Sequence, residues 1–367
     1  MKKFGFGLMR LPLTNREDQT SIDIAHVSKM ADKFLKAGFT YFDTAACYHN
    51  GASEVAFREA VAKRYPREAY SITDKLSLWM VEENKFEEFF ASQLERLGVD
   101  YLDYYLLHAV NKNGYKEAVE KGAIDFMKKL KAEGKVKHIG FSFHDSAEVL
   151  NDILSKEPEM EIVQLQINYL DWEDGGVQSR LCYEVAQKYN KPVLVMEPVK
   201  GGSLANVRGE IRRMFKAAAP NMSIASWAIR YAATLDSVVT VLSGMSNEEQ
   251  VNDNLSYMAD FKPLNREELD IVKKAAEMIR SDILIPCTAC RYCVPECPMG
   301  IEIPDYFKAY NMIKTDGREK AIEEFKAIAE KGSNPSDCVK CGACEGVCPQ
   351  KLGIRDFLCD ITEELDK

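Results

Sequence analysis

Four side chains capable of acid–base chemistry stand where short apolar runs end. Asp43 and Tyr48 follow the first run, Lys75 ends the second and His108 ends the third. An acid, a phenol, an amine and an imidazole at successive strand ends form a candidate catalytic constellation, provided that the strands are parallel and adjacent. We therefore expect general acid–base chemistry at one end of a sheet.

Each of these residues alone also has an ordinary structural explanation. A strand-end Asp or Lys is more often half of an ion pair, and a single Tyr usually packs. The ordered set of four favours a catalytic role. Among the other histidines, His26 and His138 are expected to be ordinary surface or core residues, whereas His49 and His144 flank the expected mouth of the site and are weaker candidates for substrate contact.

A second pattern with chemical meaning occupies the last part of the chain. Two runs share the spacing C-x-x-C-x-x-C-x-x-x-C-P, with Cys287, Cys290, Cys293 and Cys297 in one and Cys338, Cys341, Cys344 and Cys348 in the other. Bacterial ferredoxins use this spacing to hold two 4Fe–4S clusters, and the fourth cysteine of each run usually binds the other cluster. We therefore expect crossed ligation, in which Cys348 completes the first ligand set and Cys297 the second. A zinc site is disfavoured because it prefers separated cysteine pairs.

The remaining cysteines follow no such pattern. Cys359 lies outside both runs and Cys47 adjoins Tyr48, and both are expected to be packed thiols. Nine of the eleven cysteines lie in the last 81 residues. This distribution indicates metal ligation in a reducing compartment rather than disulfides.

The elements that must position these groups alternate regularly along the chain. The candidate strands are Phe4–Met9, Thr40–Asp43, Ser71–Lys75, Leu102–His108, His138–Ser142, Ile162–Gln166, Pro192–Glu197 and Val238–Leu242. The amphipathic segments between them are Ile22–Lys36, Glu54–Arg64, Lys85–Leu97, Tyr115–Ala132, Ser146–Leu154, Val177–Tyr189, Leu204–Lys216 and Ile224–Thr234. This alternation predicts an α/β fold, a closed (β/α)8 TIM barrel. No Gly-x-Gly-x-x-Gly run follows the first strand, which disfavours an open doubly wound sheet.

The character of the chain changes after two further helical patterns, Asn247–Met258 and Arg266–Arg280. We place a domain boundary near residue 282. Residues 1–282 then form the barrel, and residues 283–367 form a small, mainly helical two-cluster ferredoxin-like domain. Within the second domain we expect helices at Asp305–Ile313 and Arg318–Ala329.

The composition is that of an ordinary soluble protein. The formal net charge of −9 argues against nucleic acid or an anionic membrane as a partner, and neither a signal peptide nor a bilayer-spanning run is visible. We therefore predict a cytoplasmic protein that acts on a small molecule, with no nucleic-acid or membrane partner.

Five stretches of the sequence resemble the aldo-keto reductase family. In the family's order they are Gly5–Pro12, Ala37–Ala45, Leu97–Asp103, Gly134–Ser142 and Gly244–Asn254. The resemblance covers about residues 4–280 and implies a (β/α)8 barrel, a nicotinamide cofactor in extended form, and reduction of a carbonyl or oxidation of an alcohol. Position by position, the family's catalytic tetrad falls on Asp43, Tyr48, Lys75 and His108.

These residue types suit carbonyl reduction. Hydride that reaches a carbonyl carbon leaves an alkoxide, which the phenol of Tyr48 can protonate. Because Tyr has an ordinary pKa of about 10, we expect the ammonium of Lys75, held by Asp43, to lower the pKa of Tyr48. His108 is expected to donate a hydrogen bond to the substrate oxygen.

The resemblance also implies contacts with the nicotinamide, with departures from the family pattern. Ser142 and Gln164 match the positions that grip the carboxamide, but Phe143 stands where Asn is usual. Met196 stands where an aromatic residue generally stacks on the nicotinamide, and a thioether can pack there without equivalent stacking.

The nucleotide end of the cofactor groove departs from the pattern as well. The run Gly201-Gly202-Ser203 resembles a pyrophosphate cradle, and an ordinary turn explains it about equally well. Ser246 and Asn254 match cofactor-binding positions. Gln250 stands where members that prefer NADP usually place an Arg, so the choice between NAD(H) and NADP(H) stays open.

Three functions are compatible with this combination. The first is a carbonyl reductase whose clusters exchange electrons with a separate electron-transfer protein. Hydride carries two electrons, whereas a 4Fe–4S cluster typically transfers one. Direct electron transfer between the nicotinamide and the clusters would therefore need a cofactor that converts two-electron into one-electron steps, such as a bound flavin. No flavin motif is visible. The second is a reductase with structural or docking clusters. The third is a nucleotide-binding redox sensor, against which the intact tetrad counts.

Overall fold

The computed structural model describes residues 2–82 and 85–366, and its contacts divide the chain into two compact units. The first unit comprises Met1–Glu173, Gln178–Pro198 and Ser226–Asn265. The second comprises Asp174–Val177, Val199–Ala225 and Arg266–Lys367. The domain boundary near residue 282 stays a prediction, because the contacts also assign three stretches that precede it, residues 174–177, 199–225 and 266–282, to the second unit.

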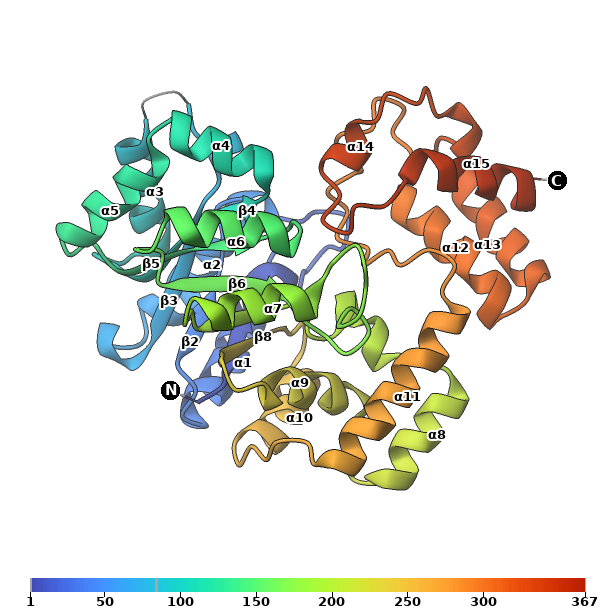
Figure 1. Cartoon of the computed structure of the whole chain (residues 1–367), viewed down its shortest axis with the longest axis horizontal. Coiled ribbons are helices and arrows are strands. Elements are labelled where there is room, and N and C mark those ends of the chain that lie inside the picture. The colour runs from blue at the N-terminus through green and yellow to red at the C-terminus, as the bar shows by residue number, and fades with distance from the viewer. Residues whose placement is uncertain (1, 83–84, 367) are drawn as a thin grey trace. The chain divides into compact units, whose positions relative to one another are not determined.

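The first unit contains a closed barrel of eight strands, hydrogen-bonded to one another in chain order (Figure 1). They are β1 (Phe4–Gly7), β2 (Tyr41–Asp43), β3 (Ser71–Leu76), β4 (Leu102–Val110), β5 (Val136–Phe143), β6 (Ile162–Gln166), β7 (Val193–Met196) and β8 (Val238–Gly244). All neighbouring pairs are parallel, and β1 closes the ring by pairing with β8. The predicted TIM barrel is confirmed, and every predicted strand overlaps an observed one.

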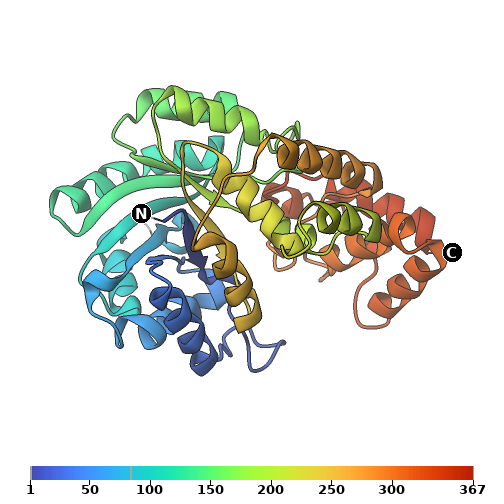
Figure 2. The same ribbon diagram turned by 90° about the horizontal axis from the view of Figure 1, so that it is seen from below.

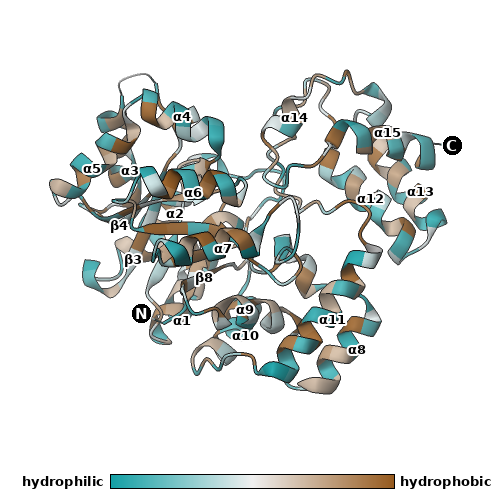
Figure 3. Ribbon diagram, in the orientation of Figure 1, coloured by the Kyte–Doolittle hydropathy of each residue, from teal (hydrophilic) through white to brown (hydrophobic). Residues whose placement is uncertain are grey.

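Helices of the first unit lie outside the strands (Figure 2). They are α1 (Ile24–Lys36), α2 (Ala52–Phe57), α3 (Phe86–Leu97), α4 (Lys112–Glu120), α5 (Ala123–Ala132), α6 (Ala147–Lys156), α7 (Ser179–Lys188), α9 (Ile224–Thr234), most of which belongs to this unit, and α10 (Glu248–Met258). Parallel strands covered by helices are buried on both faces, so they are apolar along their length. The ribbon of β6 is accordingly hydrophobic over most of its length in Figure 3.

An aromatic cluster fixes α1 against the first two strands. The ring of Phe34 on α1 lies 5.7 Å from that of Phe6 on β1 and 5.2 Å from that of Phe42 on β2. All three side chains are fully buried. Edge-to-face aromatic pairs at this spacing add about 0.5–1.5 kcal/mol each beyond area burial, so they position β2, which ends at Asp43.

Three predicted helices differ from the observed elements. The segment Tyr115–Ala132 is two helices, because the chain adopts a positive φ of 71° at Gly122. The segment Glu54–Arg64 is α2 followed by a π-helical turn, Arg58–Ala62. The segment Leu204–Lys216 is shortened to α8 (Gly209–Ala218), while Leu204 and Ala205 end a 3-10 turn, Lys200–Ala205, in which Gly201 and Gly202 have φ values of 64° and 98°.

The second unit is mainly helical. It contains α8, α11 (Arg266–Asp282), α12 (Ile303–Thr315), α13 (Arg318–Ala329), α14 (Ala343–Gly346) and α15 (Ile354–Leu365). Both helices predicted between the cysteine runs are present, and α15 was not predicted. The buried core of the second unit is built around Tyr306, Phe307 and Phe325, and Cys293 and Cys344 are packed into it. Among the described residues of the whole chain, no helix is long and apolar enough to cross a bilayer.

Candidate active site and cysteine pockets

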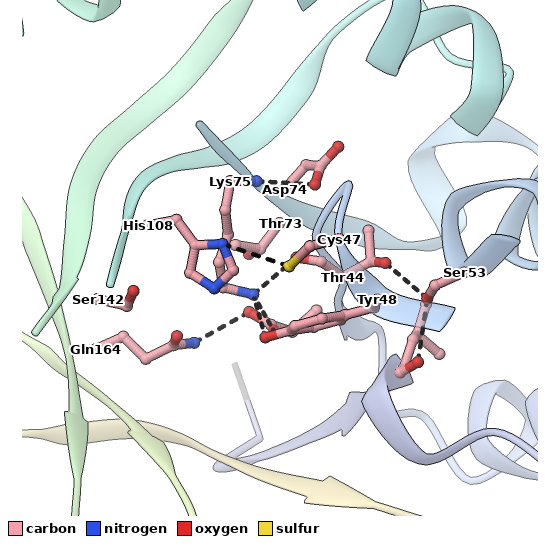
Figure 4. Close-up of polar contacts among 12 residues, drawn as sticks. Thr44, Cys47, Tyr48, Ser53, Thr73, Asp74, Lys75, His108, Ser142 and Gln164 are labelled. Carbon is pink, nitrogen blue, oxygen red and sulfur yellow. Dashed lines mark hydrogen bonds and ion pairs between the residues drawn. The ribbon is translucent and has the colours of Figure 1, made fainter. Parts of the chain in front are cut away.

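The barrel brings the four predicted catalytic residues together at the carboxyl end of neighbouring strands. Asp43 ends β2, Tyr48 opens the 3-10 turn Tyr48–Gly51, and Lys75 and His108 lie near the ends of β3 and β4. Figure 4 shows the side chains of Lys75, Tyr48 and His108 gathered in one place. The condition on which the sequence prediction depended, that the strands be parallel and adjacent, is met.

Lys75 is the centre of this group. Its Nζ donates to Asp43 Oδ1 at 2.7 Å, to the carbonyl of Thr44 at 2.7 Å and to the hydroxyl oxygen of Tyr48 at 3.2 Å. The side chain of Lys75 has no exposed surface. A buried amine needs a paired charge and satisfied protons, and these three contacts supply both and fix the direction of Lys75.

The pKa of Tyr48 moves in the direction opposite to the predicted one. Burial of the hydroxyl raises the pKa of Tyr48 well above its ordinary value, and the charge of Asp43 raises it further. Although Tyr48 as a residue keeps some exposure, its hydroxyl lies against the buried Lys75–Asp43 pair. Burial, together with the charge of Asp43, thus outweighs the lowering expected from Lys75. Tyr48 is therefore a neutral phenol that retains its proton.

His108 is a neutral imidazole. Burial lowers the pKa of His108 well below its ordinary value, and the nearby charge of Lys75 lowers it further. Its Nδ1 lies 2.7 Å from Ser77 Oγ and 3.9 Å from Cys47 Sγ, and its ring is 5.9 Å from that of Tyr48. Ser77 is fully buried and was not identified from the sequence; its place two residues after Lys75 was the available signal.

Ser142 and Gln164 face each other as partners in the β5–β6 register. Gln164 Nε2 donates to Asp43 Oδ2 at 3.0 Å, and Ser142 Oγ accepts from the backbone N–H of Ala109 at 2.7 Å. The amide of Gln164 is thus fixed in orientation, and the hydroxyl proton of Ser142 remains available to a ligand. Both residues are buried, and this donor and acceptor set fits a carboxamide. Met196 ends β7 and is half-buried.

The predicted pyrophosphate turn belongs to the second unit. A Cβ on Gly201 would lie 2.3 Å from the carbonyl oxygen of Thr288, so only glycine fits there. No atom lies within 4 Å of a Cβ added to Gly202. Ser203 Oγ donates to the carbonyl of Lys200 at 2.7 Å. The turn is therefore packed on the backbone beside Cys287 through its first glycine.

Of the three remaining predicted cofactor residues, Ser246 precedes α10, and Gln250 and Asn254 lie within it. Ser246 N donates to Gln250 Oε1 at 2.7 Å, and Ser246 Oγ donates to the carbonyl of Arg10 at 2.7 Å. Asn254 is buried, donates to Ser243 Oγ at 3.0 Å and accepts from Tyr257. Gln250 is exposed, and its amide oxygen ties the loop before α10 to the helix.

A buried polar network behind Lys75 was also missed from the sequence. Asp74 accepts from Lys75 N at 2.8 Å and from Gln93 Nε2 at 2.9 Å, while Glu54 pairs with Arg96. Burial, together with Glu54, raises the pKa of Asp74 well above its ordinary value. The network fixes the backbone that carries Lys75. By contrast, His49 accepts from Leu11 N at 3.1 Å, which gives it a structural role at the mouth.

The eight cysteines of the two runs line two separate pockets in the second unit. Cys287, Cys290, Cys293 and Cys348 line the first cysteine pocket. Cys297, Cys338, Cys341 and Cys344 line the second cysteine pocket. In each pocket three cysteines come from one run and the fourth from the other, which is the distribution that crossed ligation requires. Among the described residues, no three or more His, Cys, Asp or Glu side chains are placed to hold a single metal ion.

Each pocket is chemically suited to the positively charged core of an iron–sulfur cluster. Burial raises the pKa of Cys287 to about 11, that of Cys293 to about 12 and that of Cys344 to about 11. Lys200 acts in the opposite direction on Cys287, although burial dominates. A thiol in such surroundings ionises only when a positive charge compensates, and a bound metal supplies it. Four convergent cysteines per pocket are the donor set of a 4Fe–4S cluster.

Comparisons with known proteins agree with this geometry. The family model described as "Aldo/keto reductase family" matches residues 3–277, and that described as "4Fe-4S dicluster domain" matches residues 286–352. An NADH-specific methylglyoxal reductase of Escherichia coli (strain K12) is 24% identical over 60% of this chain and 79% of that protein. An aldo-keto reductase of Mycolicibacterium paratuberculosis is 28% identical over 69% of this chain and 80% of that protein. The structure of an aldo/keto reductase of Klebsiella pneumoniae, solved with NADP and acetate, matches 74% of this chain and 90% of that chain. The TM-score is 0.59 and the sequence identity is 20%.

Proposed function

Because the chain belongs to the aldo/keto reductase family and carries a 4Fe–4S dicluster domain, we propose that it reduces a small aldehyde or ketone with NADH or NADPH and exchanges electrons through two clusters. The observation that carries the proposal is the fully buried Lys75, which joins Asp43 at 2.7 Å to the hydroxyl of Tyr48 at 3.2 Å. A structural ion pair between Lys75 and Asp43 does not by itself explain why Lys75 also donates a hydrogen bond to the phenol of Tyr48.

Tyr48 is the proton donor in this proposal. Lys75 donates to the phenolic oxygen, so the proton of Tyr48 points away from the ammonium and is free to be given to a substrate oxygen. The raised pKa of Tyr48 keeps that proton in place until negative charge develops on the substrate. Lys75 then stabilises the phenolate that remains, which is stabilisation specific to the transition state.

His108 orients the substrate. A hydroxyl proton donated by Ser77 to Nδ1, across the observed 2.7 Å, leaves the ring proton of the neutral imidazole on Nε2. That N–H donates to the carbonyl oxygen and polarises it. Trp79 lies over the same ring with 5.0 Å between ring centroids and is 59% exposed, so it forms a wall on which an apolar part of the substrate packs.

The nicotinamide cofactor supplies hydride when it is bound. Ser142 and Gln164, which are partners in the β5–β6 register, would hold its carboxamide and so orient the ring. Gln164 also donates to Asp43, so the residue that grips the cofactor is fixed to the residue that holds Lys75. We assign the nucleotide end of the cofactor to Ser246, Gln250 and Asn254 of the first unit, whereas the pyrophosphate role of Gly201–Ser203, which belong to the second unit, stays a prediction.

We further propose that the two cysteine pockets hold the clusters with crossed ligation and that a separate one-electron carrier protein docks near them. Support for the crossing is that Cys348 lines the first pocket and Cys297 the second. An anaerobic redox titration with and without NADH, followed by visible absorption and EPR, tests the electron exchange. Clusters that never change oxidation state over the accessible range would favour the structural alternative.

Replacement of Tyr48 by Phe tests the reductase proposal. Methylglyoxal is the first substrate, because the Escherichia coli relative is named for it. Loss of the proton donor should lower turnover by about 10²–10⁴-fold and leave cofactor affinity unchanged. Tyr189→Phe removes a phenol whose hydroxyl contacts Asn151 on the barrel exterior and should be neutral. A rate in Tyr48→Phe equal to that of the parent, on any carbonyl that the parent reduces, would refute the assignment.

A further inference from the structure

A buried lysine in the second unit has no part in the tetrad. Lys200 opens the 3-10 turn Lys200–Ala205 and is only 2% exposed. Its backbone φ is 45°, a conformation that non-glycine residues adopt rarely. A long cationic side chain is almost never fully buried unless a partner requires it.

The contacts of Lys200 lead to the first cysteine pocket. Its Nζ donates to Gln350 Oε1 at 3.3 Å. Gln350 is 8% exposed, follows Cys348 by two residues and lines that pocket. The ammonium is thus separated from the pocket by one side-chain amide.

The backbone next to Lys200 fixes this placement. A Cβ on Gly201 would meet the carbonyl oxygen of Thr288 at 2.3 Å, so the two segments are in direct backbone contact. Thr288 is 4% exposed, follows Cys287 directly and lines the same pocket. The turn that carries Lys200 therefore cannot move away from the pocket without breaking two contacts.

Two cations that line the cysteine pockets are screened. Arg291 at the first pocket pairs with Glu302 and Asp305, and its side chain is 47% exposed. Arg355 at the second pocket pairs with Glu345 at 2.8 Å and is 44% exposed. Solvent and carboxylates weaken both charges. Lys200 differs from Arg291 and Arg355 in its burial, since it is only 2% exposed and its charge lies in a low-dielectric setting.

We propose that Lys200 is a positioning residue that raises the reduction potential of the cluster in the first cysteine pocket. Four thiolates make such a cluster anionic, and reduction adds one electron from an external reductant, without a proton, and so one more negative charge. A buried ammonium stabilises the reduced form more than the oxidised form, and net charge is among the determinants of cluster potential. The inference rests on the cluster assignment above and not on the carbonyl reductase activity.

The test is a dithionite titration of the anaerobically purified full chain, followed by EPR, in Lys200→Met and Lys200→Gln. Loss of the charge should make reduction of one cluster about tenfold less favourable, a negative shift of about 59 mV for one electron. The other cluster should keep its potential and serve as an internal reference. Lys200→Arg, which keeps the charge, should restore the parent potential.

Two controls separate this role from a structural one. Lys308→Met removes the same charge from an exposed position on α12 and should shift neither cluster. Iron and sulfide content must equal that of the parent, which also tests the cluster assignment by itself. Unchanged potentials in both neutral variants, equal shifts of both clusters, or loss of iron from both neutral variants would each overturn the proposal.

Discussion

Lys75 shows how a single buried charge organises the active site. Transfer of an isolated ammonium into the interior costs several kcal/mol, and Asp43 offsets that cost from 2.7 Å. Burial is the largest cause of both neighbouring pKa shifts: it keeps Tyr48 protonated, with Asp43 acting in the same direction, and His108 neutral, with Lys75 acting in the same direction.

These two shifts predict the pH dependence of reduction. Tyr48 acts in its protonated form, so activity falls as pH rises through its pKa, and the raised pKa moves that fall above pH about 10. His108 acts in its neutral form, so activity falls as pH drops through its pKa, and the lowered pKa moves that fall well below pH about 6.5. We expect kcat/KM for methylglyoxal to be flat between these limits. A limb near pH 6.5 that disappears in His108→Gln would contradict the neutral, buried imidazole.

Gln250 predicts the cofactor preference. The parent should bind NADH at least as well as NADPH, because no guanidinium stands at this position. Gln250→Arg should tighten NADPH binding by about 10–100-fold, since a charge-assisted contact contributes about 1.5–3 kcal/mol, and should leave NADH binding unchanged. Gln187→Arg adds the same charge on exposed α7 and should change neither. A hundredfold preference of the parent for NADPH would show that another residue binds the 2′-phosphate.

At the scale of elements, the pairing of β5 with β6 holds the carboxamide residues in register. Gly140 on β5 pairs with Ile162 on β6, two residues before the pair Ser142 and Gln164. A Cβ on Gly140 would lie 2.1 Å from the carbonyl oxygen of Ile162. The absence of a side chain at Gly140 therefore lets β5 and β6 approach each other, and this approach determines the spacing between Ser142 and Gln164.

Gly140→Ala should force the two strands apart. We expect a loss of about 1–3 kcal/mol in unfolding free energy, the usual cost of overpacking, measured by urea denaturation. KM for the cofactor should rise as well, because Ser142 and Gln164 separate. Gly7→Ala is the matched control in β1, since its Cβ would meet nothing closer than 3.5 Å. Equal stability of the two variants would show that β5 and β6 adjust without strain.

At the scale of the whole molecule, the second unit depends on two distant runs of cysteines. Each pocket combines residues that are far apart in sequence, such as Cys297 with Cys338, Cys341 and Cys344. Both pockets also contact the core around Tyr306 and Phe307, in which Cys293 and Cys344 are buried. Ligation of iron should therefore contribute to the folding free energy of this unit.

Crossed ligation predicts which cluster each variant damages. The parent should contain about eight iron and eight sulfide ions, the content of two cubanes. Cys297→Ala should damage the cluster of the second pocket, and Cys348→Ala that of the first, with separate EPR signals to tell them apart. Cys359→Ala, outside both pockets, should keep both clusters. If Cys297→Ala instead spares the second pocket and damages the first, ligation is local to each run.

Much of the molecule follows from local pattern in the sequence. Alternating apolar runs and amphipathic segments predict the barrel, because buried parallel strands and covering helices have different periods. The identities and order of Asp43, Tyr48, Lys75 and His108 mark the site, and cysteine spacing marks the clusters. These features depend on neighbours in the chain, so a sequence displays them.

Other features were decided by the tertiary structure alone. The pKa of Tyr48 depends on burial and on a carboxylate from another strand, and the sequence prediction of its direction was wrong. Ser77 meets His108 and Lys200 reaches Gln350 only because strands and loops fold together. The distribution of Cys297 and Cys348 between pockets agrees with the predicted crossing, while their ligation stays a prediction. Local dielectric and long-range contact arise from packing, and spacing along the chain carries no measure of either.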